Sequence, residues 1–137
     1  MNYTQIIKLD ITPNGDMPVV RIKQGDASAR FIKMLLMNGS DVWAPENGVS
    51  FKFRCEKPDR SSVIIESGVV DETLERVLLT VSGNEVTLEL ISQISMVAGK
   101  CRCDICMEID DQIISTMPFI IDVIGSPTLQ DDITYVR

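Results

Sequence analysis

The chain has 137 residues, of which 45% are hydrophobic, and it carries a net charge of −7 with no histidine. This composition predicts one domain with a buried core, argues against binding to the phosphates of nucleic acid, and excludes Ser-His-Asp catalysis, Cys-His catalysis and every His-ligated metal site. No apolar run is long enough to span a bilayer and the N-terminus shows no secretory signal, so we expect a protein made in the cytoplasm without membrane insertion.

The first half of the chain predicts four strands. They cover residues 5–11, 19–23, 29–37 and 49–55. In the fourth, Phe51, Phe53 and Cys55 alternate with charged residues, which is typical of a strand with one buried face. Clusters rich in Gly, Asn and Asp separate the strands and predict turns.

The inward face of strand 29–37 is ambiguous, because apolar residues occupy both of its faces. One alternative places Phe31, Lys33 and Leu35 inward, and the other places Ile32, Met34 and Leu36 inward. We favour the first, on the basis of the resemblance described below, with the Lys33 side chain snorkelling to solvent or a bulge nearby.

The second half of the chain predicts more short strands and one helical turn. Strands are expected at 63–65, 76–81 and 86–90, a short helix at 92–97, and a β-hairpin over 99–123. In that hairpin, Cys101, Cys103 and Ile105 alternate with polar residues until Asp110 and Asp111 break the pattern. From this alternation we expect one shared core, made of Phe51, Phe53, Cys55, Cys101, Cys103, Ile105 and Phe119.

Many short strands, regular turns and almost no helix predict an all-β fold, an antiparallel β-sandwich. We expect residues 1–126 to form this single domain and residues 127–137 to form a polar C-terminal tail. No internal repeat is visible.

The four cysteines raise the question of a metal site. Cys101 and Cys103 point to one face of a strand and Cys106 to the other, so they cannot converge on one zinc ion. A disulfide from Cys55 to Cys101 or to Cys103 is an alternative if their strands are adjacent, but a cytoplasmic origin disfavours it. We expect no metal and no cofactor.

No catalytic motif stands out elsewhere. The acidic pairs at 71–72, 110–111 and 131–132 fall in turns or the tail, where carboxylates are normally solvated. Trp43 lies in a predicted loop, where it either caps the sandwich or anchors a protein contact. Trp43, Tyr3 and Tyr135 are the only Trp and Tyr residues and are the candidate interface residues.

Several short motifs together resemble the N-terminal domain of baseplate upper proteins, a family from the tails of siphophages and prophages of Gram-positive bacteria. The matching stretches are 5–10, 21–26, 35–40, 49–53, 57–59, 99–100 and 115–119, in the family's order. Arg60 stands where the family usually has Gly. The family's helical linker and distal domain have no counterpart within these 137 residues.

The resemblance implies an immunoglobulin-like β-sandwich that docks other tail or baseplate proteins and catalyses no reaction. It also implies a homo-oligomer within the assembly, formed in the host cytoplasm and then carried in the virion tail. The alternative is a carbohydrate-binding or adhesin-type sandwich. The low aromatic content of 5% favours docking, because sugar sites usually present exposed aromatic rings.

Overall fold

The computed structural model describes residues 3–12, 17–26, 30–46, 49–116 and 118–125. The predicted C-terminal tail at 127–137, including Tyr135, lies outside the described residues. The elements in chain order are β1 (Tyr3–Asp10), β2 (Val19–Lys23), β3 (Arg30–Asn38), β4 (Asp41–Val42), β5 (Ser50–Glu56), β6 (Ser62–Glu66), β7 (Val70–Asp71), β8 (Arg76–Val77), β9 (Leu79–Ser82), β10 (Glu85–Glu89), α1 (Ser92–Ser95), β11 (Gly99–Ile109), β12 (Gln112–Ser115) and β13 (Phe119–Ile124).

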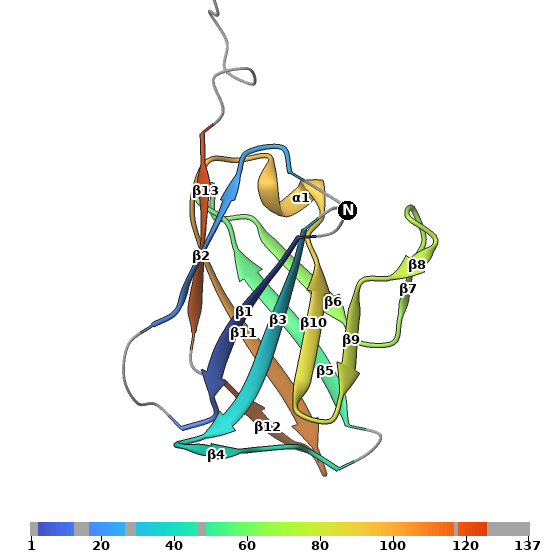
Figure 1. The fold of residues 1–137 in the computed structure, drawn as a ribbon. Coiled ribbons are helices and arrows are strands. Elements are labelled where there is room, and N and C mark those ends of the chain that lie inside the picture. Colours follow the sequence, from blue (N-terminus) through green and yellow to red (C-terminus); the bar gives the residue numbers. More distant parts are fainter. Residues whose placement is uncertain (1–2, 13–16, 27–29, 47–48, 117, 126–137) are drawn as a thin grey trace, which may run out of the picture.

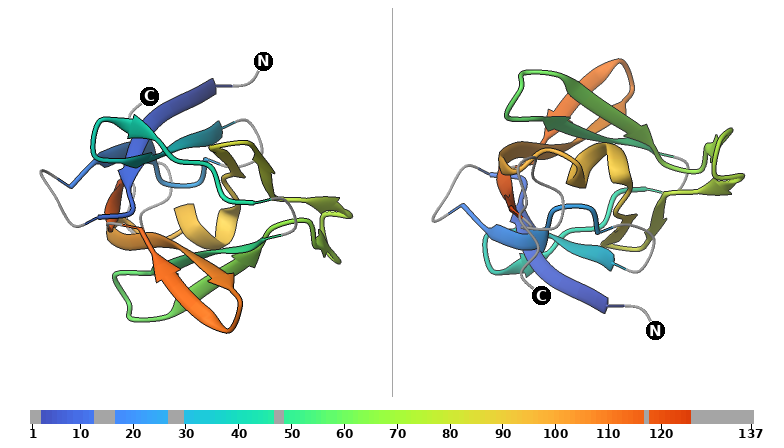
Figure 2. Two further views of the ribbon diagram at one scale, coloured as in Figure 1. Left: turned by 90° about the horizontal axis from the view of Figure 1, so that it is seen from below. Right: turned by 90° about the horizontal axis from the view of Figure 1, so that it is seen from above.

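The strands form an all-β sandwich of two layers, which confirms the predicted fold class (Figure 1). Sheet A has the order β1-β3-β10-β9, with β4 paired to β3. Sheet B has the order β2-β13-β11-β5-β6, with β12 paired to β11. The short β7–β8 hairpin projects from one side of the sandwich, and α1 lies over one end, between the layers (Figure 2).

Two pairings are parallel, β1 with β3 and β2 with β13, whereas the remaining pairs are antiparallel. The chain therefore supplies an outer strand to sheet A and then one to sheet B. The two outer strands are linked, because the Gln5 side-chain amide donates a hydrogen bond to the Arg21 carbonyl oxygen at 2.9 Å.

The core lies between the sheets and contains the whole predicted set of seven side chains. The register explains why they meet. Cys103 pairs with Cys55 and Ile105 with Phe53 across β11 and β5, and Cys103 pairs with Phe119 on the other side. The rings of Phe53 and Phe119 lie 6.2 Å apart between centroids.

The favoured orientation of strand 29–37 is wrong. β3 buries Ile32, Met34 and Leu36, so Phe31, Lys33 and Leu35 lie on the outer face of sheet A. Lys33 forms an ion pair with Glu85 at 3.6 Å on that face. Burying the other set would have desolvated the Lys33 amine, and this cost decides between two faces of similar hydrophobicity.

The remaining elements confirm the predictions with changes at their boundaries. The predicted strand at 76–81 is divided between β8 and β9, and β4 and β7 were not predicted. The closing hairpin returns as two strands, β12 and β13. Two residues separate Cys103 from Cys106 on β11, whereas three separate their partners Phe119 and Ser115, as in a β-bulge.

Candidate functional site

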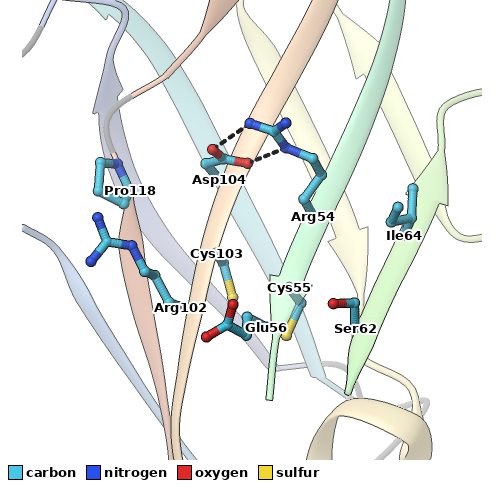
Figure 3. Close-up of a pocket in the computed structure, with 9 residues that line it drawn as sticks. All are labelled: Arg54, Cys55, Glu56, Ser62, Ile64, Arg102, Cys103, Asp104 and Pro118. Carbon is cyan, nitrogen blue, oxygen red and sulfur yellow. Dashed lines mark hydrogen bonds and ion pairs between the residues drawn. The ribbon is translucent and has the colours of Figure 1, made fainter. Parts of the chain in front are cut away.

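The outer face of sheet B carries two ion pairs. The Arg54 guanidinium donates to both carboxylate oxygens of Asp104, at 2.8 and 2.7 Å, and to the Ser115 hydroxyl at 3.0 Å (Figure 3). The hydrogen bonds to Asp104 raise the pKa of Arg54. On the same face Lys52 pairs with Glu66 at 3.6 Å.

A shallow pocket on this face is lined by Arg54, Ile64, Arg102 and Pro118, with Cys55 and Cys103 behind it (Figure 3). A hydrogen bond with Cys101 lowers the pKa of Cys55, but the contact with Cys103 and burial outweigh it and raise that pKa to about 12. The thiol next to the pocket is therefore protonated at neutral pH, and it is not an activated nucleophile.

Large apolar side chains are exposed on the outer face of sheet A, as Ile64 and Ile113 are in sheet B. We define the outer apolar face as Ile6 on β1, Phe31, Leu35 and Met37 on β3, and Val42 on β4. Ile6 is 62% and Val42 67% exposed, and the three residues on β3 are half-buried. A groove across this face is lined by Thr4, Ile6, Phe31, Lys33 and Thr87.

The strand register places apolar and charged side chains next to each other on this face. Ile6 lies beside Lys33, Lys8 beside Leu35, and Val42 beside Met37. Lys33 forms an ion pair with Glu85 at one side, and the exposed Lys8 lies on the same face. Several exposed apolar side chains gathered on one face are typical of a protein contact.

Of the three candidate interface residues, two lie within the described residues, at opposite ends of sheet A. Tyr3 begins β1, is exposed, and lies under the Arg30 guanidinium, 5.6 Å from the ring centre. Trp43 follows β4, is half-buried and packs against the core, and its backbone N–H donates to the Leu36 carbonyl oxygen at 3.1 Å. Their part in an interface stays a prediction.

Sequence reasoning missed the outer apolar face, although a signal for it existed. A strand that is apolar on both faces needs cover on both sides in a two-layer sandwich, and residues 30–37 carry that pattern. The favoured interpretation placed Phe31 and Leu35 in the core, whereas these residues lie on the outer surface of sheet A.

All four cysteines are free thiols. Cys106 points away from Cys101 and Cys103, as predicted, and within the described part of the chain no three Cys, Asp or Glu side chains converge as metal ligands would. No helix among the described residues is long and apolar enough to cross a membrane.

Comparison with solved structures finds several chains with a similar fold. The fold is similar to the N-terminal domain of phage TP901-1 ORF48, with a TM-score of 0.57 and 12% identity over 89% of this chain and 98% of that chain. No protein family model matches the sequence, and no curated protein is significantly similar to it. The match shows a shared fold, and the immunoglobulin-like topology implied by the resemblance stays a prediction.

Proposed function

We propose that this protein is a structural component of a phage or prophage tail, which docks other baseplate proteins and catalyses no reaction. The observation that carries the proposal is the outer apolar face. Its five side chains lie on one face of sheet A, and two of them, Ile6 and Val42, are more than half exposed to solvent. Burial of such a surface stabilises a complex by about 25 cal/mol for each Å² of apolar area removed from water.

Two independent lines support the phage assignment. The sequence motifs resemble a baseplate family, and the fold is similar to a domain of a phage protein. A docking role also fits the chemistry of the chain, because the pocket next to Cys55 and Arg54 holds no activated nucleophile. On this proposal the chain assembles in the host cytoplasm, forms a homo-oligomer within the baseplate and resides in the virion tail.

The test is light scattering of the chain alone and mixed with the baseplate proteins of the phage or prophage that encodes it. We expect a complex at micromolar concentration that Ile6→Asp abolishes, because the substitution places a charge in the outer apolar face. The matched control is Ile113→Asp on β12, where the replaced isoleucine is 69% exposed and lies in sheet B.

A complex that tolerates Ile6→Asp as well as Ile113→Asp would place the contact elsewhere and contradict the role of this face. No complex at high micromolar concentration would contradict the docking function itself. In that case glycan binding by the same preparation becomes the next measurement.

A further inference from the structure

β6 is the outer strand of sheet B, and the backbone of its outer side has no partner strand among the described residues. Two hydrogen bonds fix which residues face outward. Ser67 N–H donates to the Phe51 carbonyl at 2.9 Å, and Lys57 N–H donates to the Ser61 carbonyl at 2.8 Å. Since bonded and non-bonded pairs alternate in antiparallel sheets, Ser62, Ile64 and Glu66 direct their N–H and C=O groups away from β5.

This outer edge borders a groove between β6 and the β7–β8 hairpin. Its apolar surface includes Ile64, Val69 and Val70, which are 61%, 51% and 56% exposed. Its rim carries the carboxylates of Glu66, Asp71 and Glu72. An extended chain lying here would gain backbone hydrogen bonds from β6 and apolar contacts from the groove.

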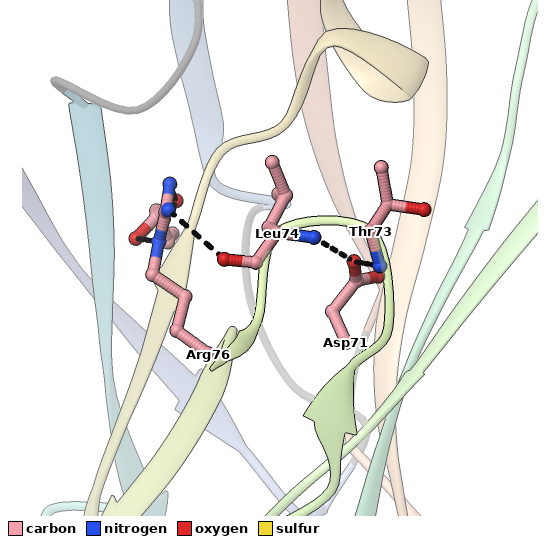
Figure 4. A network of polar contacts seen from close by, with 5 residues as sticks. Asp71, Thr73, Leu74 and Arg76 are labelled. Atoms are coloured by element: carbon pink, nitrogen blue, oxygen red, sulfur yellow. Dashed lines mark hydrogen bonds and ion pairs between the residues drawn. The ribbon is translucent and has the colours of Figure 1, made fainter.

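The hairpin that forms the far wall is held in place before any partner binds. Arg76 on β8 donates from Nε to the buried Glu89 carboxylate on β10, at 2.9 Å to Oε1. The Asp71 carboxylate accepts the backbone N–H groups of Thr73 and Leu74, at 3.0 and 2.9 Å (Figure 4). A fixed wall reduces the ordering that binding would otherwise require.

The charge of the groove indicates which kind of partner it can bind. Among the six groove residues named above, three are acidic and none is basic. The Lys52 amine next to Glu66 and the Arg76 guanidinium opposite Asp71 each neutralise part of one of these charges. A second copy of this chain would bring the same acidic edge, and each chain has a net charge of −7. Like charges across such an edge are destabilising, whereas Lys or Arg would be attracted.

We propose that β6 and this groove bind an extended segment of a partner tail protein, in which apolar residues alternate with Lys or Arg. The segment adds a strand to sheet B, with its apolar side chains over Val69 and Val70 and its cations near Glu66 and Glu72. The proposal deepens the docking function proposed above and rests on it for the identity of the partner as a tail protein.

The probe is a short synthetic peptide that alternates Lys and Val, with both ends capped, and a peptide that alternates Glu and Val is its control. We expect the Lys-Val peptide to bind and to slow hydrogen exchange at the Ile64 and Glu66 amides. Ile64→Pro should weaken binding at least about tenfold. Because the Ile64 N–H does not bond to β5, proline at this edge position removes the outward N–H and the Ile64 side chain without breaking a hydrogen bond between β5 and β6.

A second pair of variants keeps the test decisive if Ile64→Pro fails to fold. Glu72→Gln should weaken binding several-fold at low salt, whereas Glu108→Gln on β11, outside the groove, should not. Equal binding of both peptides, equal binding by the Ile64→Pro protein, or no binding at millimolar peptide would each overturn the proposal. So would a dimer of this chain that Ile64→Pro abolishes, because the occupant would then be a second copy.

The two proposals fail separately. The peptide experiment reports only on the β6 edge, whereas the Ile6→Asp experiment reports on the outer apolar face of the other sheet. Peptide binding without a baseplate complex would contradict the tail function and leave the edge as a strand-binding site. A baseplate complex without peptide binding would contradict the proposed strand-binding site at β6 and leave the tail function supported.

Discussion

The ring of Pro58 fills the space into which a side chain at Gly99 would project. A Cβ atom at Gly99 would lie 2.8 Å from Cγ and 3.1 Å from Cβ of Pro58. The two residues belong to separate stretches of the family resemblance, at 57–59 and 99–100. In the fold these stretches meet where the β5–β6 turn lies against the start of β11. Two motifs that are distant in sequence therefore form one contact.

Gly99→Ala should destabilise the protein by about 1–3 kcal/mol, because the added methyl group overlaps Pro58. Gly99 also has φ +128°, a conformation that residues with a Cβ rarely adopt. Chemical denaturation measures the effect. In the Pro58→Ala background the same substitution should cost less, because the contact with Cγ at 2.8 Å is removed, while the contact with Cβ at 3.1 Å and the backbone strain remain. Equal costs in both backgrounds would show that the Pro58 contact is not the cause.

Arg60→Gly should stabilise the protein by about 0.5–1 kcal/mol, because Arg60 has φ +68° at the end of the β5–β6 turn. The Arg60 N–H donates to the Lys57 carbonyl oxygen at 2.9 Å, which closes a turn with Arg60 itself as the left-handed residue at its end. The control is the opposite change, Gly39→Ala, at φ +64° with no atom near the added Cβ. This variant should lose stability, and a shift of the same sign in both variants would contradict the backbone explanation.

Phe53→Ala should cost about 3–5 kcal/mol of unfolding free energy, because it opens a cavity beside Phe119 in the core. Phe31→Ala, on the outer apolar face, removes the same ring from a half-exposed position and should cost clearly less. Urea denaturation of the two variants tests the corrected orientation of β3 together with the position of Phe53. Similar losses for both would argue that Phe31 is also a core residue.

Stability should fall as the pH rises from about 9 toward 12. A hydrogen bond with Cys101 lowers the pKa of Cys55, but the contact with Cys103 and burial outweigh it and raise this pKa to about 12. The pKa of Cys101 is also raised, by its hydrogen bond with Cys55 and by burial. The unfolded chain therefore releases these thiol protons first, so alkali favours unfolding. Below the ordinary thiol pKa of 9.0 both states are protonated and this effect is absent.

The measurement is the urea midpoint at pH 8 and at pH 10. The Cys55→Ala/Cys101→Ala variant is the control for other groups that titrate in this range, and it should show a smaller shift. An equal shift in both proteins would assign the alkaline loss to those other groups.

The sequence was most informative where one face of a strand is polar. In residues 49–55 and 99–107 charged residues alternate with apolar ones, so the inward set could be predicted and the shared core of Phe53, Cys103 and Phe119 followed. Strand 29–37 is apolar on both faces apart from Lys33, and its partners on β10, Val86 and Leu88, are buried together with Met34 and Ile32. Those partners come from a distant part of the chain, which local periodicity does not report.

The candidate surfaces were less predictable for the same reason. Ile6, Leu35 and Val42 share a face only because β1 and β4 both pair with β3. The groove beside β6 depends on where the two-residue strands β7 and β8 lie, and strands of this length have no measurable period. Both surfaces are products of pairing between distant segments.

The parallel pairing of β2 with β13 also orders the events of folding. Val19 pairs with Ile120 and Ile22 with Val123, so nearly the whole described chain separates the partners. During synthesis Val20 and Ile22 therefore remain without their neighbours until β13 has left the ribosome. Closure of this loop is among the most entropically expensive steps in the folding of the domain, and sheet B acquires β2 as its outer strand only after β13 has been synthesised.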